Sequence, residues 1–347
     1  MKKVAIIGAG LLGRVTALNL LEDENIELTI YEKAGYDGEG AAASTAAGML
    51  APFAELETAE SVILDHGLQS IKLWPSLLEK IGIPEAFQQE GSIITAHPQD
   101  LSELRHFIST LHAKVPAAKE IKTLGKRELT ELEPSLTHHS QAFHLYAEGQ
   151  VNSAMFIEAS TQYLLDHPRV TWYENHPVDE GLSDVEDFNA VHGTDFDWVF
   201  DTRGLGAKAE MPDLRGVRGE VFWIDAPEVD ISRPTRLMHP RYKIYIVPRA
   251  NHRFVIGATE IESEDDSPMS VRSSLELLSA VYSMHPSFAE ARIVKTTTDC
   301  RPSLEDNLPR IEQHKGLTRI NGLYRHGYLL APAIVEEALK NGIRKSA

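Results

Sequence analysis

The sequence has almost none of the cysteine from which disulfide networks and cysteine-based metal sites are built. One of its 347 residues, Cys300, is a cysteine, so no internal disulfide can form, and the 15 histidines are scattered without metal-ligand spacing. Basic residues are also in deficit, because 34 lysines and arginines stand against 51 acidic residues, for a net charge of -17. This balance argues against binding of nucleic acid or of an anionic membrane surface. We therefore expect no metal site and no nucleic-acid partner.

Long hydrophobic runs are missing as well. The longest stretch of low polarity, 41–54, is rich in alanine and glycine and falls short of the roughly 18 residues that suggest a membrane-spanning helix. Met1-Lys2-Lys3 before uncharged residues imitates a secretory signal, but Arg14 interrupts that stretch and no small-x-small cleavage site follows. We expect a cytoplasmic protein without a membrane span, organised as two domains or one elaborate domain.

What the sequence does contain, at its start, is a dinucleotide-binding motif. Val4–Ile7 reads as a buried strand that leads into Gly8-Ala9-Gly10-Leu11-Leu12-Gly13, and Glu32 follows the next strand. Gly10 lets the backbone approach a pyrophosphate, Gly13 lets the following helix pack closely, and that helix directs free N–H groups at the phosphates. The motif predicts a bound dinucleotide whose ribose hydroxyls bond to Glu32.

A second segment, 44–52, also suits a cofactor. It begins with the hydroxyls of Ser44 and Thr45, which could bond phosphate oxygens, and then has almost no side-chain bulk. Such a backbone can lie against a flat ring, although a tightly packed helix start in the core is the alternative. The apolar run 198–201, which ends in a glycine turn, fits a parallel sheet that approaches the same cofactor.

Periodicity predicts the remaining elements. We expect Pro75 to bend or interrupt the helix 62–81, and Pro332 to begin the last helix, which Asn341-Gly342 would end. The expected helices are 11–21, 62–81, 100–111, 126–132, 156–165, 275–284 and 332–341, and the expected strands are 27–31, 92–96, 170–173, 220–224, 243–248 and 254–258.

These segments together resemble the flavin-dependent D-amino acid oxidase superfamily, and most closely its glycine oxidase branch, which is associated with thiamine biosynthesis. The resemblance is carried by the two N-terminal segments and by three further ones, Tyr245–Arg249 with Val255–Thr259, Arg301-Pro302, and Arg325–Ala333. It implies an α/β fold, with a Rossmann-type FAD-binding domain of residues 1–84, 146–212 and 298–347, and an inserted antiparallel-sheet substrate domain of residues 85–145 and 213–297.

The resemblance also implies an activity. FAD would be the cofactor, and glycine or another small amine-bearing acid would transfer a hydride from Cα to flavin N5. The resulting imine is hydrolysed to an oxo acid and ammonia, and oxygen reoxidises the flavin to give hydrogen peroxide. Assembly into a homo-oligomer is compatible with this expectation.

Particular residues inherit roles from the resemblance. Arg301 would pair with the substrate carboxylate and Tyr245 would add a second donor, while Met49 and Arg325 would border the reacting atoms. The residues expected at FAD are Gly8, Gly10, Leu11, Leu12, Gly13, Glu32, Lys33, Ser44, Thr45, Ala47, Gly48, Met49, Val178, Thr202, Gly204, Arg301, Arg325, His326, Gly327, Tyr328, Leu329 and Leu330.

Other interpretations stay open at this point. Arg301 could instead form a structural ion pair with Glu305 or Asp306. The enzyme could be an amino acid dehydrogenase, or modify an amine on a protein, with an acceptor other than oxygen. Arg203, a large cation in the turn after a cofactor strand, and Ile311-Glu312, which lacks a glycine that the family commonly has, raise the alternative of a non-catalytic flavin-binding partner.

Overall fold

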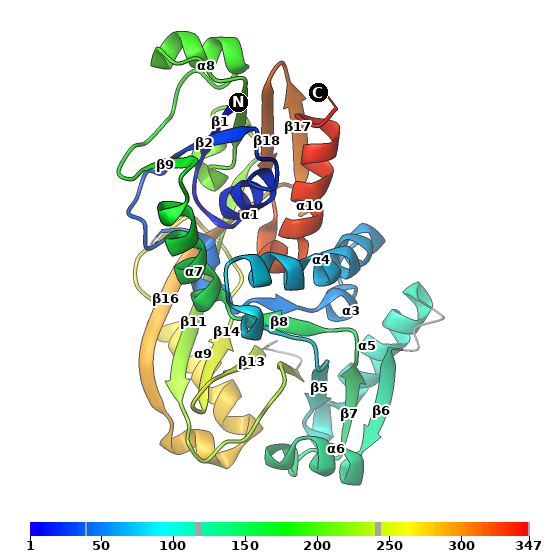
Figure 1. Ribbon diagram of the computed structural model, residues 1–347. Helices are drawn as coiled ribbons and strands as arrows, with labels where there is room; N and C mark the ends of the chain where they lie inside the picture. The colour runs from blue at the N-terminus through cyan, green and yellow to red at the C-terminus, as the bar shows by residue number, and fades with distance from the viewer. Residues whose placement is uncertain (39, 116–119, 240–243, 346–347) are drawn as a thin grey trace.

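The computed structural model of the protein describes residues 1–38, 40–115, 120–239 and 244–345. The upper part in Figure 1 is built on a six-stranded sheet, and both termini lie there. All neighbouring strands of this sheet are parallel except the β17–β18 pair. In spatial order the strands are β17 (Arg310–His314), β18 (Leu317–Asn321), β10 (Trp198–Asp201), β1 (Lys2–Ile7), β2 (Ile26–Tyr31) and β9 (Val170–Tyr173).

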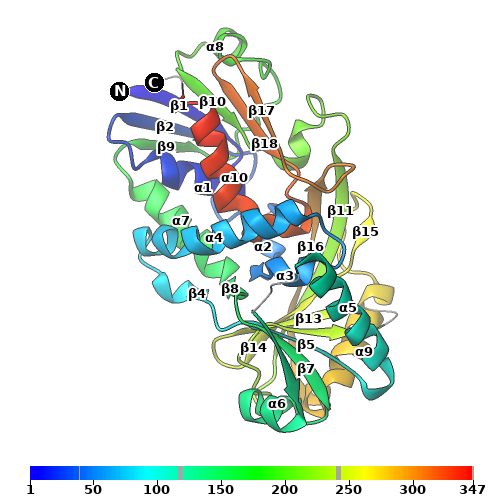
Figure 2. The ribbon, with the colours of Figure 1, turned by 90° about the vertical axis from the view of Figure 1, so that its right-hand side faces the viewer.

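The lower part is built on a nine-stranded sheet that is antiparallel apart from the β5–β12 pair. Its long strands β11 and β16 run from the lower part up toward the first sheet (Figure 2). The path is β15 (Ile261–Glu262), β11 (Arg215–Asp225), β14 (Arg253–Gly257), β13 (Ile244–Arg249), β12 (Thr235–Met238), β5 (Ser92–Ala96), β7 (Gln141–Leu145) and β6 (Ile121–Gly125), and β16 (Arg292–Ser303) pairs with β11.

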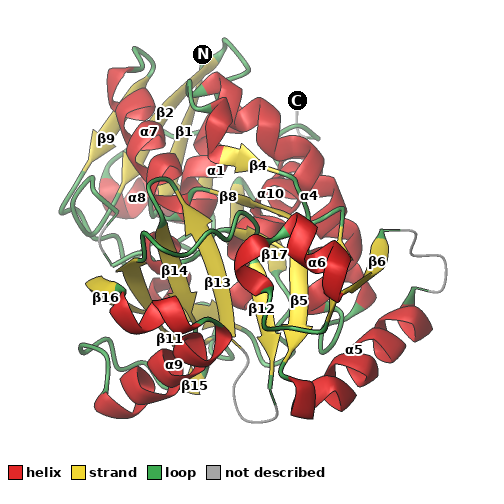
Figure 3. Cartoon of the chain, turned by 90° about the horizontal axis from the view of Figure 1, so that it is seen from below, coloured by secondary structure: helices red, strands yellow, loops and turns green. Residues whose placement is uncertain are grey.

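A three-stranded sheet lies between these two parts (Figure 1). It has the order β3 (Met49–Leu50), β8 (Gly149–Val151) and β4 (Phe87–Gln88). The helices are α1 (Leu11–Leu20), α2 (Ala42–Thr45), α3 (Pro52–Glu55), α4 (Ser61–Lys80), α5 (Leu101–Lys114), α6 (Lys126–Leu132), α7 (Ser153–Asp166), α8 (Val185–His192), α9 (Val271–Met284) and α10 (Gly327–Asn341). Seen from below, α6 and α9 lie in front of the nine-stranded sheet (Figure 3).

The expected α/β fold class is confirmed, and most expected elements lie within a few residues of the observed ones. Lys243, at the start of an expected strand, lies outside the described residues. The division into two domains stays a prediction, and β16 crosses its boundary at residue 298. In the described part of the chain, no helix is both long and apolar enough to cross a membrane.

The structure corrects two expectations about proline. Pro75 does not interrupt α4, which is continuous from Ser61 to Lys80, and the expected bend at Pro75 stays a prediction. Pro332 does not begin the last helix, because α10 starts at Gly327 and contains Pro332 in its interior. A proline inside a helix leaves the carbonyl four residues earlier without its helical donor.

The neighbouring helix α4 supplies the missing partner. Trp74 Nε1 donates a hydrogen bond of 2.8 Å to the carbonyl of Tyr328, four residues before Pro332, and Ser70 Oγ accepts one of 3.1 Å from the Ala333 N–H. The Trp74 ring also stacks on the Tyr328 ring, with centroids 5.8 Å apart. The α4–α10 contact therefore makes this interior proline tolerable.

We predict that Trp74→Phe lowers the free energy of unfolding by about 1–3 kcal/mol, because it leaves a buried carbonyl without a donor. The matched control is Trp223→Phe, which removes the same atoms, since Trp223 Nε1 is buried without a partner among the described residues. Denaturant unfolding of both variants measures the difference. Equal losses would show that the Trp74 hydrogen bond contributes nothing beyond packing.

Candidate active site

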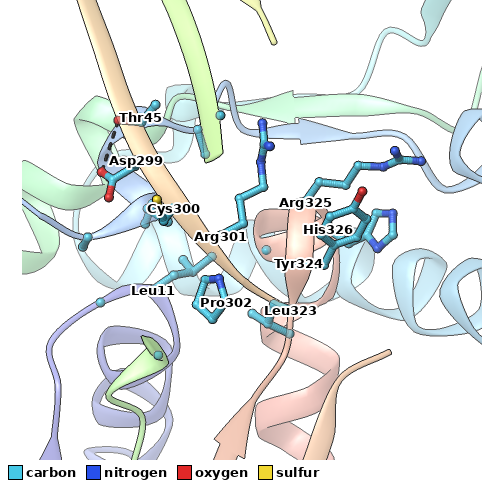
Figure 4. A pocket seen from close by; sticks show the side chains of 18 of the residues that line it. Leu11, Thr45, Asp299, Cys300, Arg301, Pro302, Leu323, Tyr324, Arg325 and His326 are labelled. Atoms are coloured by element: carbon cyan, nitrogen blue, oxygen red, sulfur yellow. Dashed lines mark hydrogen bonds between the residues drawn. The ribbon is translucent and has the colours of Figure 1, made fainter. Parts of the chain in front are cut away.

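A cavity of about 630 Å³ extends along the junction of the two large sheets. Its lining includes residues of the β1–α1 turn, of β13 and β16, and of the start of α10. In Figure 4, Arg301 and Arg325 extend from neighbouring segments, and Thr45 and Asp299 lie on the other side of Arg301 from Arg325. Of the residues expected at the site, all line this cavity except Gly13, Ser44 and Leu330.

The β1–α1 turn has the form that an anionic cofactor needs. Gly8 has φ +94, and a Cβ there would lie 2.8 Å from the carbonyl oxygen of Thr202. At Gly10, which lines the cavity, no atom lies within 4 Å of where a Cβ would be, so the backbone faces open space. Helix α1 begins there with no side-chain cap and no acidic residue in its first turn. Its free N–H groups and positive dipole end suit a pyrophosphate.

Glu32 lines the cavity next to this turn. Its two carboxylate oxygens accept hydrogen bonds from the backbone N–H groups of Ala9, at 2.6 Å, and Ala34, at 3.0 Å. Each oxygen has a second lone pair, so Glu32 can still accept a bond from a ribose hydroxyl. The carboxylate thus shapes the turn and remains available to a ligand.

The three expected residues that do not line the cavity have structural roles instead. A Cβ at Gly13 would lie 2.0 Å from the Gly8 carbonyl oxygen, which agrees with the predicted close packing of the helix. The Ser44 hydroxyl donates to the Gly38 carbonyl at 2.7 Å, and Leu330 is fully buried in the core. Thr45, by contrast, faces the cavity and donates to Asp299 Oδ2 at 3.3 Å. Burial raises the pKa of Asp299.

Arg301 reaches the cavity from β16 across a space that a glycine leaves open. A Cβ at Gly219 on the paired strand β11 would lie 2.2 Å from Arg301 Nη2. Nη1 donates to the carbonyl of Thr259 at 3.1 Å, and no carboxylate of the described residues, Glu305 and Asp306 included, lies within ion-pair distance of the guanidinium. The alternative of a structural ion pair therefore has no support among the described residues, and a guanidinium fork lines the cavity.

Tyr245, on β13, lines the same cavity as Arg301. A Cβ at Gly257 on the next strand would lie 2.5 Å from the Tyr245 hydroxyl oxygen, so a second glycine makes room for a second site residue. Burial raises the pKa of Tyr245, against the opposing charges of Arg301 and Arg236. The phenol is therefore protonated near neutral pH and can donate a hydrogen bond.

Arg325 belongs to an ion cluster centred on Glu55. Its Nε is 2.8 Å from Glu55 and its Nη1 is 2.8 Å from Glu260, while Arg236 and His326 also contact Glu55. Burial raises the pKa of Glu55, but the charges of Arg236 and Arg325 and the hydrogen bond with His326 outweigh it and hold the pKa well below its usual range. Glu55 is therefore ionised, and Arg325 is held rigidly in the cavity wall.

Arg203, which the sequence places near the cofactor, is neutralised. Its guanidinium pairs with Asp201 at 2.9 Å and Glu210 at 2.7 Å, and its side chain is 7% exposed. Asp201 also pairs with Arg319 at 2.8 Å. The cation is thus compensated within the protein, which removes one of the two reasons for considering a non-catalytic protein.

Sequence reasoning missed Glu55, Asp299 and Gly219. An acid inside the apolar stretch 51–56 was the available signal for Glu55, and a glycine inside a strand was the signal for Gly219, because such a glycine often marks a close approach. Nothing local distinguishes Asp299. No group of three or more potential metal ligands occurs among the residues that the structure describes.

Comparison with known proteins supplies an independent line of observation. Residues 3–338 match the DAO family, described as FAD dependent oxidoreductase. A Rhizobium etli protein that bears the name thiamine biosynthesis oxidoreductase ThiO is 37% identical over 340 residues, covering 97% of this chain and 95% of that protein. Glycine oxidase of Geobacillus kaustophilus is 29% identical over 359 residues, covering 95% of this chain and 89% of that protein.

Solved structures agree with these matches. The crystal structure of the Geobacillus kaustophilus glycine oxidase superposes with a TM-score of 0.80 at 26% identity, covering 99% of this chain and 96% of that one. Iminodiacetate oxidase (IdaA) from Chelativorans sp. BNC1 shares the fold, with a TM-score of 0.79 at 22% identity, over 96% of this chain and 94% of that one.

We predict that Gly8→Ala weakens cofactor binding at least tenfold, because it strains the backbone and pushes against the Thr202 carbonyl. Gly82→Ala is the matched control, since Gly82 has φ +77 and nothing within 4 Å of a Cβ. Both variants should lose about 1 kcal/mol of stability from the positive φ. Equilibrium dialysis or fluorescence titration measures affinity, and equal affinities would contradict the assigned turn.

Through the buried carboxyl of Glu148, we predict that the stability of the protein depends on pH. This fully buried carboxyl accepts hydrogen bonds from the Ala54 N–H, at 2.7 Å, and from the Ser92 hydroxyl, so it fixes the start of the segment that carries Glu55. Burial raises the pKa of Glu148 to about 7. The folded state therefore holds a proton that the unfolded state has already lost, and stability falls as the pH rises from about 4.5 to about 7.

We expect Glu148→Gln to remove this dependence. Relative to the unmodified protein, the variant should gain stability between pH 5 and pH 8, by about 2–3 kcal/mol, the linkage energy of the shift. Thermal or denaturant unfolding at the two pH values measures it. If the difference in free energy of unfolding between the two proteins is the same at both pH values, the pKa of Glu148 is not raised by folding.

Proposed function

Because the chain belongs to the DAO family of FAD-dependent oxidoreductases, we propose that it catalyses the oxidative deamination of glycine or another small amine-bearing acid. The products are an imine, which water hydrolyses to an oxo acid and ammonia, and hydrogen peroxide. Similarity over nearly the whole chain to proteins named ThiO and glycine oxidase supports this substrate class, and it favours a place in thiamine biosynthesis.

The residues of the cavity fit FAD. The β1–α1 turn and the uncapped start of α1 would hold the pyrophosphate, and Glu32 would hold a ribose. The segment 45–49 and the start of α10 would border the flavin, with the positive end of the α10 dipole toward the ring. Bound FAD supplies the acceptor for the hydride that leaves the substrate Cα, and oxygen then takes up the electrons.

Arg301 carries the proposal. A guanidinium without a carboxylate partner among the described residues, held in the wall of a cofactor cavity, has the planar fork that pairs with a carboxylate. Tyr245 would donate a further hydrogen bond to the same carboxylate, and together they fix the position and orientation of Cα. A neutral amine needs no strong general base, so orientation is the main contribution of the chain.

The Glu55 cluster gives Arg325 a positioning role in this scheme. Its Nε and Nη1 are taken by the two carboxylates and its Nη2 donates to the Thr58 hydroxyl at 2.8 Å. Such a guanidinium forms part of a rigid wall of the substrate space. Met49, on β3, lines the same space with an apolar side chain.

We predict that Arg301→Ala lowers kcat/KM for glycine at least 100-fold, because about 3 kcal/mol of charge-assisted pairing is lost, while FAD stays bound. Arg301→Lys should recover only part of this loss, because an ammonium does not form the fork. The control is Arg310→Ala, which removes an exposed arginine paired with Asp213. Peroxide release with glycine, sarcosine and small D-amino acids gives the rates.

Two outcomes would contradict the proposal. One is a yellow, folded protein that is inert toward the whole panel, and the other is an Arg301→Ala variant with undiminished turnover. Anaerobic reduction by substrate, followed by admission of air, identifies the acceptor. Rapid reoxidation supports oxygen, whereas slow reoxidation would assign the electrons to another acceptor.

A further inference from the structure

Arg249, the last residue of β13, connects the nine-stranded sheet to a wall of the cofactor cavity. Its Nη2 donates a hydrogen bond of 2.6 Å to the Ala47 carbonyl, and Ala47 lines the cavity. Its Nη1 donates to Gln150 Oε1 at 2.7 Å and to the Pro248 carbonyl at 2.9 Å. One guanidinium thus reaches segments that lie about a hundred and two hundred residues away along the chain.

The segment 47–49 is held both by Arg249 and by strand β8. Gln150 is the register partner of Met49 in the three-stranded sheet, and the Gly48 carbonyl accepts a hydrogen bond of 2.8 Å from the Val151 N–H. A Cβ at Gly48 would lie 2.0 Å from the Val151 carbonyl, so strand β8 supports the segment closely. Arg249 supports the segment through the Ala47 carbonyl, and Ala47, Gly48 and Met49 all line the cavity.

Among the described residues, no carboxylate lies within ion-pair distance of Arg249. By contrast, Arg236 pairs with one carboxylate and Arg203 with two. Its Nε is buried without a partner among the described residues. Burial lowers the pKa of Arg249 to about 10, against the opposing effects of Tyr328 and Tyr245, which both line the cavity. An uncompensated buried cation is costly, and a tether alone would not require one.

We propose that Arg249 is a positioning residue that holds the segment 47–49 against the flavin and whose uncompensated charge favours the reduced cofactor. The inference rests on the proposed function. Reduction delivers a hydride, with two electrons and one proton, from the substrate, so negative charge develops on the ring. A fixed cation behind the wall stabilises that charge where little water is present to screen it.

Three variants separate the charge from the tether. Arg249→Gln keeps hydrogen-bond donors and removes the charge, whereas Arg249→Lys keeps the charge and removes the fork. Arg253→Gln is the matched control, because Arg253 is the register partner of Arg249 on β14 and is an exposed arginine paired with Asp225 at 2.8 Å. The purified FAD-bound proteins are titrated with dithionite against a reference dye, and FAD dissociation constants are measured in parallel.

We expect Arg249→Gln to shift the equilibrium toward oxidised flavin about tenfold, which is about 30 mV for a two-electron couple. Arg249→Lys should keep the potential close to that of the unmodified protein while binding FAD several-fold more weakly, and the control should change neither. If Arg249→Gln folds poorly, Gln150→Met tests the tether with the charge intact, and it should weaken FAD binding at constant potential.

An unchanged potential in Arg249→Gln overturns the role of the charge, and unchanged FAD affinity in both Arg249→Lys and Gln150→Met overturns the positioning role. These readouts need no substrate. A protein that binds FAD but does not oxidise glycine would therefore refute the proposed function and still decide the role of Arg249.

Discussion

The buried carboxylate of Glu55 is the interaction on which the geometry of this cavity depends. It joins helix α3 to Arg236 on β12 of the nine-stranded sheet and to Arg325 and His326 at the start of α10. Without Glu55, the guanidinium groups of Arg236 and Arg325 would lose the carboxylate that they share at the junction of the two parts of the molecule. One ionised carboxylate thus connects elements from both parts of the molecule that line the cavity.

Glycines give two side chains of the cavity wall the room that they need. Gly219 and Gly257 are needed because the side chains of Arg301 and Tyr245 occupy the space that a Cβ would take. Gly48 also has no room for a Cβ, which would lie 2.0 Å from the backbone carbonyl oxygen of Val151. Site residues and the glycines beside them are therefore parts of one arrangement, although they lie on different strands.

The distribution of charge around the cavity is uneven. Arg203, Arg236 and Arg325 pair with carboxylates, while Arg301 and Arg249 have none within ion-pair distance among the described residues. The paired cations stiffen the walls. The unpaired ones face or adjoin the space where a carboxylate substrate and a reduced flavin would bring negative charge. These ligands would therefore supply the negative charge opposite Arg301 and Arg249.

The sequence by itself determined the features that depend on neighbouring residues. The β1–α1 turn with Glu32, and helices such as α6, follow from local periodicity and from glycine at fixed spacing, and the resemblance to a family added Arg301 and Tyr245. Only the tertiary structure decided that Glu55 is the centre of an ion cluster, that Thr45 meets Asp299 and that Trp74 satisfies the carbonyl freed by Pro332. The partners in these contacts are far apart along the chain, and no local pattern encodes which of many acids or indoles will meet a given group once two sheets have packed together.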